Sequence, residues 1–121
     1  MIKTGGLTHL HLMVTDIQRS LAFYQTVFGM EVKFWAGAGL VFLNTPGSHD
    51  LIALHQAERD QPTGPGGGIL HFGLQLEDRA DLEDAIKQVV AAGGVLKKRG
   101  EFTPGMTFAY VADPDGYEIE L

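Results

Sequence analysis

The chain repeats itself once. Two stretches, about 7–56 and 69–121, show the same succession of patterns, and their punctuating residues align at a period in the sixties. The aligned pairs are His9 with His71, Asp16 with Asp78, Gly29 with Gly93, and Pro46 with Pro114. A repeat of this size predicts duplicated units that bury a shared core, and it restricts the fold far more than composition does.

The first repeat is predicted to be a β-α-β-β-β unit. Leu7–Val14 alternates between apolar and polar residues, which indicates a strand. Asp16 is a good N-cap for an amphipathic helix, Asp16–Phe28, and Gly29 is its stop. The predicted apolar face of this helix consists of Ile17, Leu21, Tyr24 and Phe28. Three short strand candidates follow: Met30–Trp35, Leu40–Asn44 and Asp50–Gln56.

The second repeat gives the same order after a linker. Glu58–Gly68 is polar and then rich in glycine and proline, so we expect a mobile connection. Ile69–Leu76 is predicted to be a strand, and Asp78 or Asp81 caps a helix that ends at Gly93. The last three strand candidates are Val95–Arg99, Thr107–Val111 and Tyr117–Leu121. The pattern therefore predicts one α+β domain over residues 1–121, made of two βαβββ modules.

Composition excludes several classes of function. The net charge is −6 and the basic residues cluster only at Lys97–Arg99, which argues against nucleic acid or an anionic membrane as a partner. Cysteine is absent, so the chain has no disulfide, thiolate nucleophile or cysteine zinc site. No signal sequence or membrane span is evident, and we expect a cytoplasmic protein.

Three potential metal ligands occupy related strand positions. His9 and His71 lie at the same register of the two first strands, on the face opposite the apolar one. Glu120 lies on the last strand, just after the turn Asp113–Gly116. A lone histidine on a strand is usually a surface residue, but matching positions in a repeat favour a site. Two imidazoles and one carboxylate suit one divalent Fe, Mn, Zn, Ni or Co ion with open positions for substrate.

The same residues carry a resemblance that covers essentially the whole chain. The matching pieces are His9–Asp16, Ser20–Tyr24, Phe28–Gly29, Ile69–Phe72 and Asp113–Glu120. Together they resemble the vicinal oxygen chelate superfamily, which includes glyoxalase, fosfomycin thiol transferases, extradiol dioxygenases and bleomycin-binding proteins. The resemblance implies an open, curved, eight-stranded mixed sheet, usually a homodimer, with the metal held by His9, His71 and Glu120.

The resemblance also bears on the type of chemistry. Glyoxalase-like members have a fourth ligand where this chain has Ala53, so their four-ligand site is disfavoured unless His11 or His55 replaces it. His49 stands where extradiol dioxygenases carry an acid/base histidine, and Tyr110 matches a tyrosine that binds their substrate. His49 and Tyr110 therefore favour a dioxygenase, although another active-site histidine of those enzymes has no counterpart in this sequence.

The sequence therefore predicts a metal-dependent enzyme that binds a small oxygen-bearing substrate by bidentate chelation. Its chemistry would be dioxygenase-like or lyase/isomerase-like, with His49, His11 and Tyr110 as candidates for proton transfer or substrate orientation. The alternative is a non-catalytic protein that sequesters an antibiotic or metabolite. Members that work in this way generally lack the ligand triad.

Overall fold

The computed structural model describes residues 1–121, which divide into two compact units. The N-terminal unit comprises Met1–Thr63 and the C-terminal unit Gly64–Leu121. The division falls inside the segment 58–68, where the sequence loses its regular pattern.

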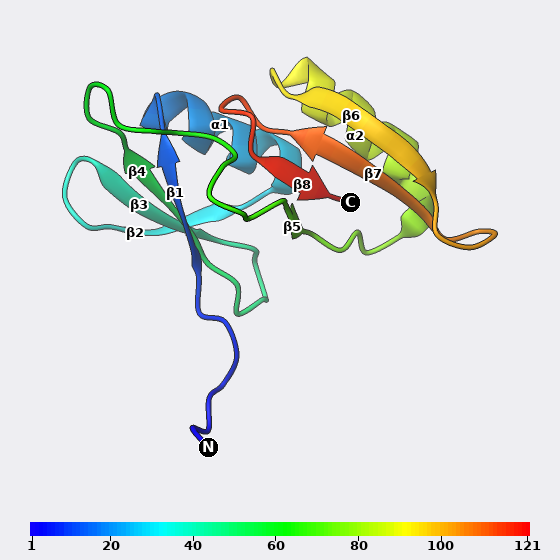
Figure 1. The fold of residues 1–121 in the computed structure, drawn as a ribbon, viewed down its shortest axis with the longest axis horizontal. Helices are drawn as coiled ribbons and strands as arrows, with labels where there is room; N and C mark the ends of the chain where they lie inside the picture. The colour runs from blue at the N-terminus through cyan, green and yellow to red at the C-terminus, as the bar shows by residue number, and fades with distance from the viewer. The chain divides into compact units, whose positions relative to one another are not determined.

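The N-terminal unit is a four-stranded sheet with one helix. In chain order its elements are β1 (Leu10–Val14), α1 (Ile17–Phe28), β2 (Glu31–Trp35), β3 (Leu40–Asn44) and β4 (Ile52–Gln56) (Figure 1). The strand order is β1-β4-β3-β2. β1 and β4 run parallel, and the other pairs are antiparallel.

Both ends of α1 are fixed by the residues that the sequence predicted. The Asp16 side chain accepts hydrogen bonds from the backbone N–H groups of Gln18 and Arg19. Gly29 closes the helix with φ at 62°, a left-handed conformation that glycine adopts without steric cost. The helix therefore begins at Ile17 and ends at Phe28.

The buried face of α1 differs slightly from the predicted one. Ser20 and Phe23 are buried together with Ile17 and Tyr24, whereas Leu21 is only partly buried. Helix α1 packs against β4, and the strand residues Leu12, Val14, Val41, Leu43 and Leu54 are buried as well. His11 and Met13 of β1, together with His9 just before the strand, therefore lie on the side that is turned away from this core.

The C-terminal unit repeats the topology. Its elements are β5 (Phe72–Gly73), the 3₁₀ helix η1 (Arg79–Asp81), α2 (Leu82–Ala91), β6 (Val95–Glu101), β7 (Thr107–Ala112) and β8 (Glu118–Glu120). The strand order is β5-β8-β7-β6, with β5 parallel to β8. Leu82, Ile86 and Val89 of α2 are buried, and α2 packs against β6 and β7. The order matches that of the first sheet strand for strand, as the repeat predicted.

Two sequence predictions need correction. The strand expected over Ile69–Leu76 contains only Phe72 and Gly73, because its partner β8 is itself three residues long and supplies few ladder positions. Ile69 and Leu70 are 74% and 73% exposed. The eight strands also form two separate four-stranded sheets instead of one eight-stranded sheet.

The linker is partly anchored at its C-terminal end. A Cβ atom at Gly64 would lie 2.5 Å from the backbone oxygen of Asp115, so only glycine allows this approach. Pro65 in turn lies beside Gly116. This part of the segment therefore packs on the turn that precedes β8, which the prediction of a mobile linker did not anticipate.

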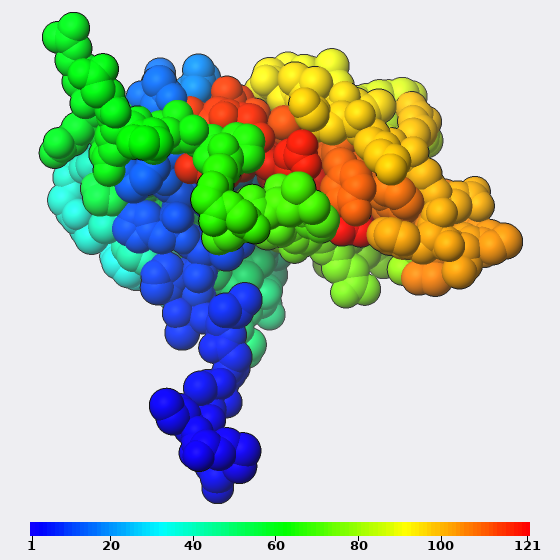
Figure 2. Space-filling view, in the orientation of Figure 1, coloured from blue at the N-terminus to red at the C-terminus, as the bar shows by residue number.

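The first residues of the chain are exposed. Residues 1–7 project from the N-terminal unit, seen in dark blue in Figure 2. None of the helices combines the length and apolar character that crossing a membrane requires.

Candidate active site

His71 and Glu120 meet in the C-terminal unit. Glu120 of β8 pairs with Gly73 of β5, and His71 precedes Gly73 by two residues, so strand alternation directs both side chains to one face. Ile119, on the opposite face of β8, is completely buried and fixes that orientation. His71 Nε2 lies 2.9 Å from Glu120 Oε2, and each side chain is 25% exposed. Both side chains are therefore partly buried and still accessible to solvent.

A row of aromatic rings leads to this pair. Tyr110 is the β7 partner of Glu120, and its ring lies 4.8 Å from that of His71 between centroids. The Phe108 ring follows at 5.3 Å from Tyr110, and the Phe102 ring stacks on Phe108 at 4.3 Å. The structure therefore places Tyr110, a predicted site residue, beside two of the predicted ligands.

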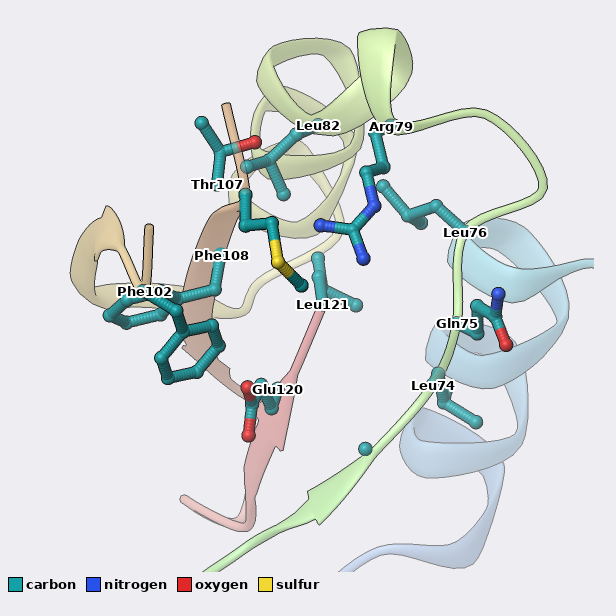
Figure 3. A pocket seen from close by; sticks show the side chains of 12 residues that line it. Leu74, Gln75, Leu76, Arg79, Leu82, Phe102, Thr107, Phe108, Glu120 and Leu121 are labelled. Carbon is teal, nitrogen blue, oxygen red and sulfur yellow. The ribbon is translucent and has the colours of Figure 1, made fainter. Parts of the chain in front are cut away.

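A cavity of about 320 Å³ opens on the same side. Its walls are mostly apolar, with Leu74, Leu76, Leu82, Phe102, Met106 and Phe108 among them. Glu120 and Arg79 supply the charged side chains, and both extend into the space (Figure 3). An apolar pocket with a few polar groups is the usual form of a small-molecule site.

Gly100 shapes the aromatic wall. A Cβ atom at this position would lie 2.9 Å from Cζ of Phe108, closer than packed carbon atoms allow. The missing side chain lets the Phe108 ring lie over β6 and stack with Phe102. This residue was not singled out from the sequence, because a glycine inside a strand has several common explanations.

The remaining predicted ligand, His9, lies in the N-terminal unit just before β1. Its Nδ1 lies 2.8 Å from Oγ1 of Thr8, and its ring meets Phe42 edge-on at 6.0 Å. The hydrogen bond at Nδ1 orients the ring and leaves Nε2 for another partner, as in many metal-ligating histidines.

His11 pairs with His55 in the same unit. His11 Nε2 lies 2.9 Å from His55 Nδ1, so one nitrogen donates and the other accepts. Burial lowers the pKa of His11 below 6.5, and the nearby His55 and His9 lower it further. His11 is therefore a neutral imidazole near pH 7, held in place by His55.

The remaining positions singled out from the sequence, His49 and Ala53, do not join these clusters. His49 is exposed in the loop between β3 and β4, where Asp50 accepts two hydrogen bonds from Thr45 at 2.7 Å. It contacts none of the other histidines of its unit. Ala53, at the position of a fourth ligand, is completely buried between β1 and β3.

Neither unit by itself gathers three histidine or carboxylate side chains at metal-binding spacing. His71 and Glu120 come together, and His9 belongs to the other unit. The site residue that the sequence did not reveal is Arg79. An arginine at a helix start is usually a solvated charge, and only the folded chain puts it in the cavity.

Comparisons with known proteins decide the family. The family model of the Glyoxalase/Bleomycin resistance protein/Dioxygenase superfamily matches residues 6–121. The chain belongs to this superfamily. It is 31% identical to lactoylglutathione lyase of Salmonella typhimurium, over 95% of this chain and 90% of that protein. It is 32% identical to the trivalent organoarsenical cleaving enzyme of a Bacillus species, over 93% of this chain and 70% of that protein.

Solved structures of the superfamily share the fold. A fosfomycin resistance protein from Listeria monocytogenes superposes with a TM-score of 0.79 at 20% identity, covering 98% of this chain and 91% of that one. Lactoylglutathione lyase from Agrobacterium tumefaciens gives 0.71 at 22% identity, covering 97% and 92%. At these identities the likeness concerns the fold alone, and it confirms the predicted α+β architecture of two modules.

Proposed function

We propose that this protein is a divalent-metal-dependent enzyme that acts on a small oxygen-bearing organic substrate bound by bidentate chelation. His9, His71 and Glu120 would hold the ion, which could be Fe, Mn, Zn, Ni or Co. The observation that carries the proposal is the 2.9 Å approach of His71 Nε2 and Glu120 Oε2.

The donors suit such an ion. Two ligands about 2.1 Å from one metal and at right angles to each other lie roughly 3 Å apart. The spacing of His71 and Glu120 agrees with that value. Imidazole nitrogen and carboxylate oxygen are also the donors that first-row divalent metals accept. The ion, when bound, would serve as a Lewis acid that stabilises negative charge on the substrate oxygens.

The chain's own residues would orient the substrate and move protons. The Tyr110 hydroxyl group is a candidate hydrogen-bond donor to substrate, because its ring packs on His71 and its strand pairs with Glu120. His11, neutral near pH 7, is a candidate base, and His55 fixes its ring. His49 is retained as a proton-transfer candidate on the resemblance alone.

The number of protein ligands supports one type of reaction over another. Ala53 supplies no fourth donor, and the nearby His55 is engaged by His11. Three protein ligands favour dioxygenase-like chemistry over a four-ligand lyase or isomerase site. The names of the relatives suggest lactoylglutathione, trivalent organoarsenicals and fosfomycin as the first compounds to assay.

A non-catalytic binding protein is the second candidate. The apolar cavity beside Glu120 favours it, because such a space can hold a ligand with or without a metal. We further propose that the protein is cytoplasmic and that it forms a homodimer. Light scattering of the purified protein would test the dimer.

Elemental mass spectrometry of the purified protein tests the enzyme proposal. We expect about one divalent metal per chain, lost in His71→Ala and kept in His49→Ala, which removes a histidine outside the ligand set. Absence of metal after reconstitution with each candidate ion would overturn the enzyme proposal and favour the binding protein.

A further inference from the structure

Arg79 is the positively charged residue in the lining of the cavity, and it has no role in the proposed metal chemistry. The side chains that line the cavity include two charged ones, Arg79 of η1 and Glu120 of β8. The protein as a whole carries a net charge of −6. Arg79 is itself exposed, and it is the one basic side chain in this mostly apolar lining.

Arg79 has no acidic partner within its unit. The comparison within the same unit is Arg99, whose guanidinium forms an ion pair with Glu83 at 2.5 Å. Arg79 makes no such pair, although Asp78 is its neighbour in sequence. The Asp78 carboxylate instead accepts the backbone N–H of Ala80 and caps η1. The guanidinium is left to extend from η1 into the cavity (Figure 3).

The walls around Arg79 are apolar. Leu76 and Leu82 flank it in the lining, and Leu82 is buried. A guanidinium group offers paired N–H donors that match a carboxylate, and the apolar residues beside Arg79 give the rest of such a ligand a surface to contact. Arg79 thus has the chemistry of an anion-binding residue.

The wall formed by Phe102 and Phe108 offers a flat aromatic surface. Phe102 is 59% exposed, whereas Phe108 beneath it is only 8% exposed. Their rings stack at 4.3 Å with 25° between planes. An exposed aromatic face that is backed by a buried one offers a planar ligand a stacking surface. The row of rings continues through Tyr110 to His71 and so ends at the proposed metal ligands.

We propose that this cavity selects aromatic carboxylates. The aromatic ring would lie against the exposed face of Phe102, which Phe108 supports from beneath, and Arg79 would bind the carboxylate. Oxygen substituents on the far side of the ring would then face Glu120. Only this last placement rests on the proposed metal-dependent function, because the recognition of ring and carboxylate needs no metal.

The test uses the full-length protein treated with chelator. Phenylacetate, its neutral amide phenylacetamide and the non-aromatic cyclohexylacetate would be titrated while backbone amide NMR shifts are followed. We expect phenylacetate to bind about ten-fold more tightly than either analogue, with shifts at the cavity residues Gly73, Thr107 and Arg79.

Variants assign the preference to Arg79. In Arg79→Gln the advantage of phenylacetate over phenylacetamide should vanish, and in Arg99→Gln it should persist. Arg79→Lys keeps the charge without the paired donors and should show a reduced preference. It also replaces Arg79→Gln if that variant does not fold, which the dispersion of its NMR spectrum reports.

Several results would overturn the proposal. They are equal affinity for the acid and the amide, an unchanged preference in Arg79→Gln, shifts confined to residues outside the cavity, or no binding of any probe. Because the titration is done without metal, its outcome is separate from that of the metal analysis. A carboxylate preference in a protein that binds no metal would leave this inference standing and remove only the proposed enzyme function.

Discussion

Glu120 Oε2 lies 2.9 Å from His71 Nε2, and Tyr110 stands beside both of them in the sheet. If this pair holds a metal, the ion binds the folded state and stabilises it by mass action. At a free metal concentration of a hundred times the dissociation constant, the gain is about 2.7 kcal/mol. That gain corresponds to a rise in melting temperature of roughly 10 °C, measurable by differential scanning fluorimetry.

Glu120→Gln removes the charge with little change in shape, so the metal-induced rise should be lost. Glu118→Gln is the matched control, because Glu118 lies on the same strand but does not line the cavity. An equal rise in both variants would exclude Glu120 as a ligand.

The pairing of His11 with His55 predicts an unusual titration. The pKa of His11 is lowered by burial first and then by His55 and His9, so NMR should show its ring titrating below 6.5. Replacing His55 by Gln should raise this pKa only in part, because the larger cause is burial. A titration of His11 above 6.5 in the wild-type protein would contradict the arrangement.

The lowered pKa of His11 also determines the direction in which stability changes with pH. A histidine whose pKa is lower in the folded state binds more protons when unfolded, so stability increases with pH through this window. The contribution of His11 is fully present above its unfolded pKa of about 6.5 and is lost as pH falls toward the folded value. Urea unfolding at several pH values, with His11→Gln as control, would measure this contribution.

Strand alternation predicted from the sequence which residues of each strand share a face, and buried Ile119 agrees with the outward orientation of Glu120. That His71, Tyr110 and Glu120 lie side by side depends also on the pairing of β8 with β5 and β7. What alternation could not predict was strand length, which depends on the partner. Ile69–Leu76 alternates well, yet β8 pairs with only Phe72 and Gly73.

Arg79 illustrates a second limit. Its place in the cavity depends on how η1 packs relative to the sheet, and the local sequence pattern does not predict that packing. The pairing of His55 with His11 likewise depends on the parallel register of β1 and β4, across a separation of 44 residues. The approach of these two histidines cannot be predicted until the pairing of the strands is known.

The N-caps of α1 and of the 3₁₀ helix η1, which leads into α2, should differ in their contribution to stability. Asp16 accepts two backbone hydrogen bonds, at 3.0 Å and 3.1 Å, whereas Asp78 accepts one at 2.9 Å. Asp16→Ala should therefore lower the free energy of unfolding by about 1–2 kcal/mol and Asp78→Ala by about 0.5–1 kcal/mol. Chemical denaturation of both variants measures the difference, and a larger loss in Asp78→Ala would contradict this assignment of the caps.

Two glycines of the C-terminal sheet should respond in opposite ways to alanine. At Gly100 the new Cβ would lie 2.9 Å from the Phe108 ring, so the ring must tilt away from Phe102. The lost stacking should cost about 0.5–1.5 kcal/mol. At Gly73 the nearest atom is 3.7 Å away, an ordinary contact, and Gly73→Ala should be neutral or slightly stabilising. Denaturation curves compare the two variants, and equal stability would show that Gly100 does not govern the position of Phe108.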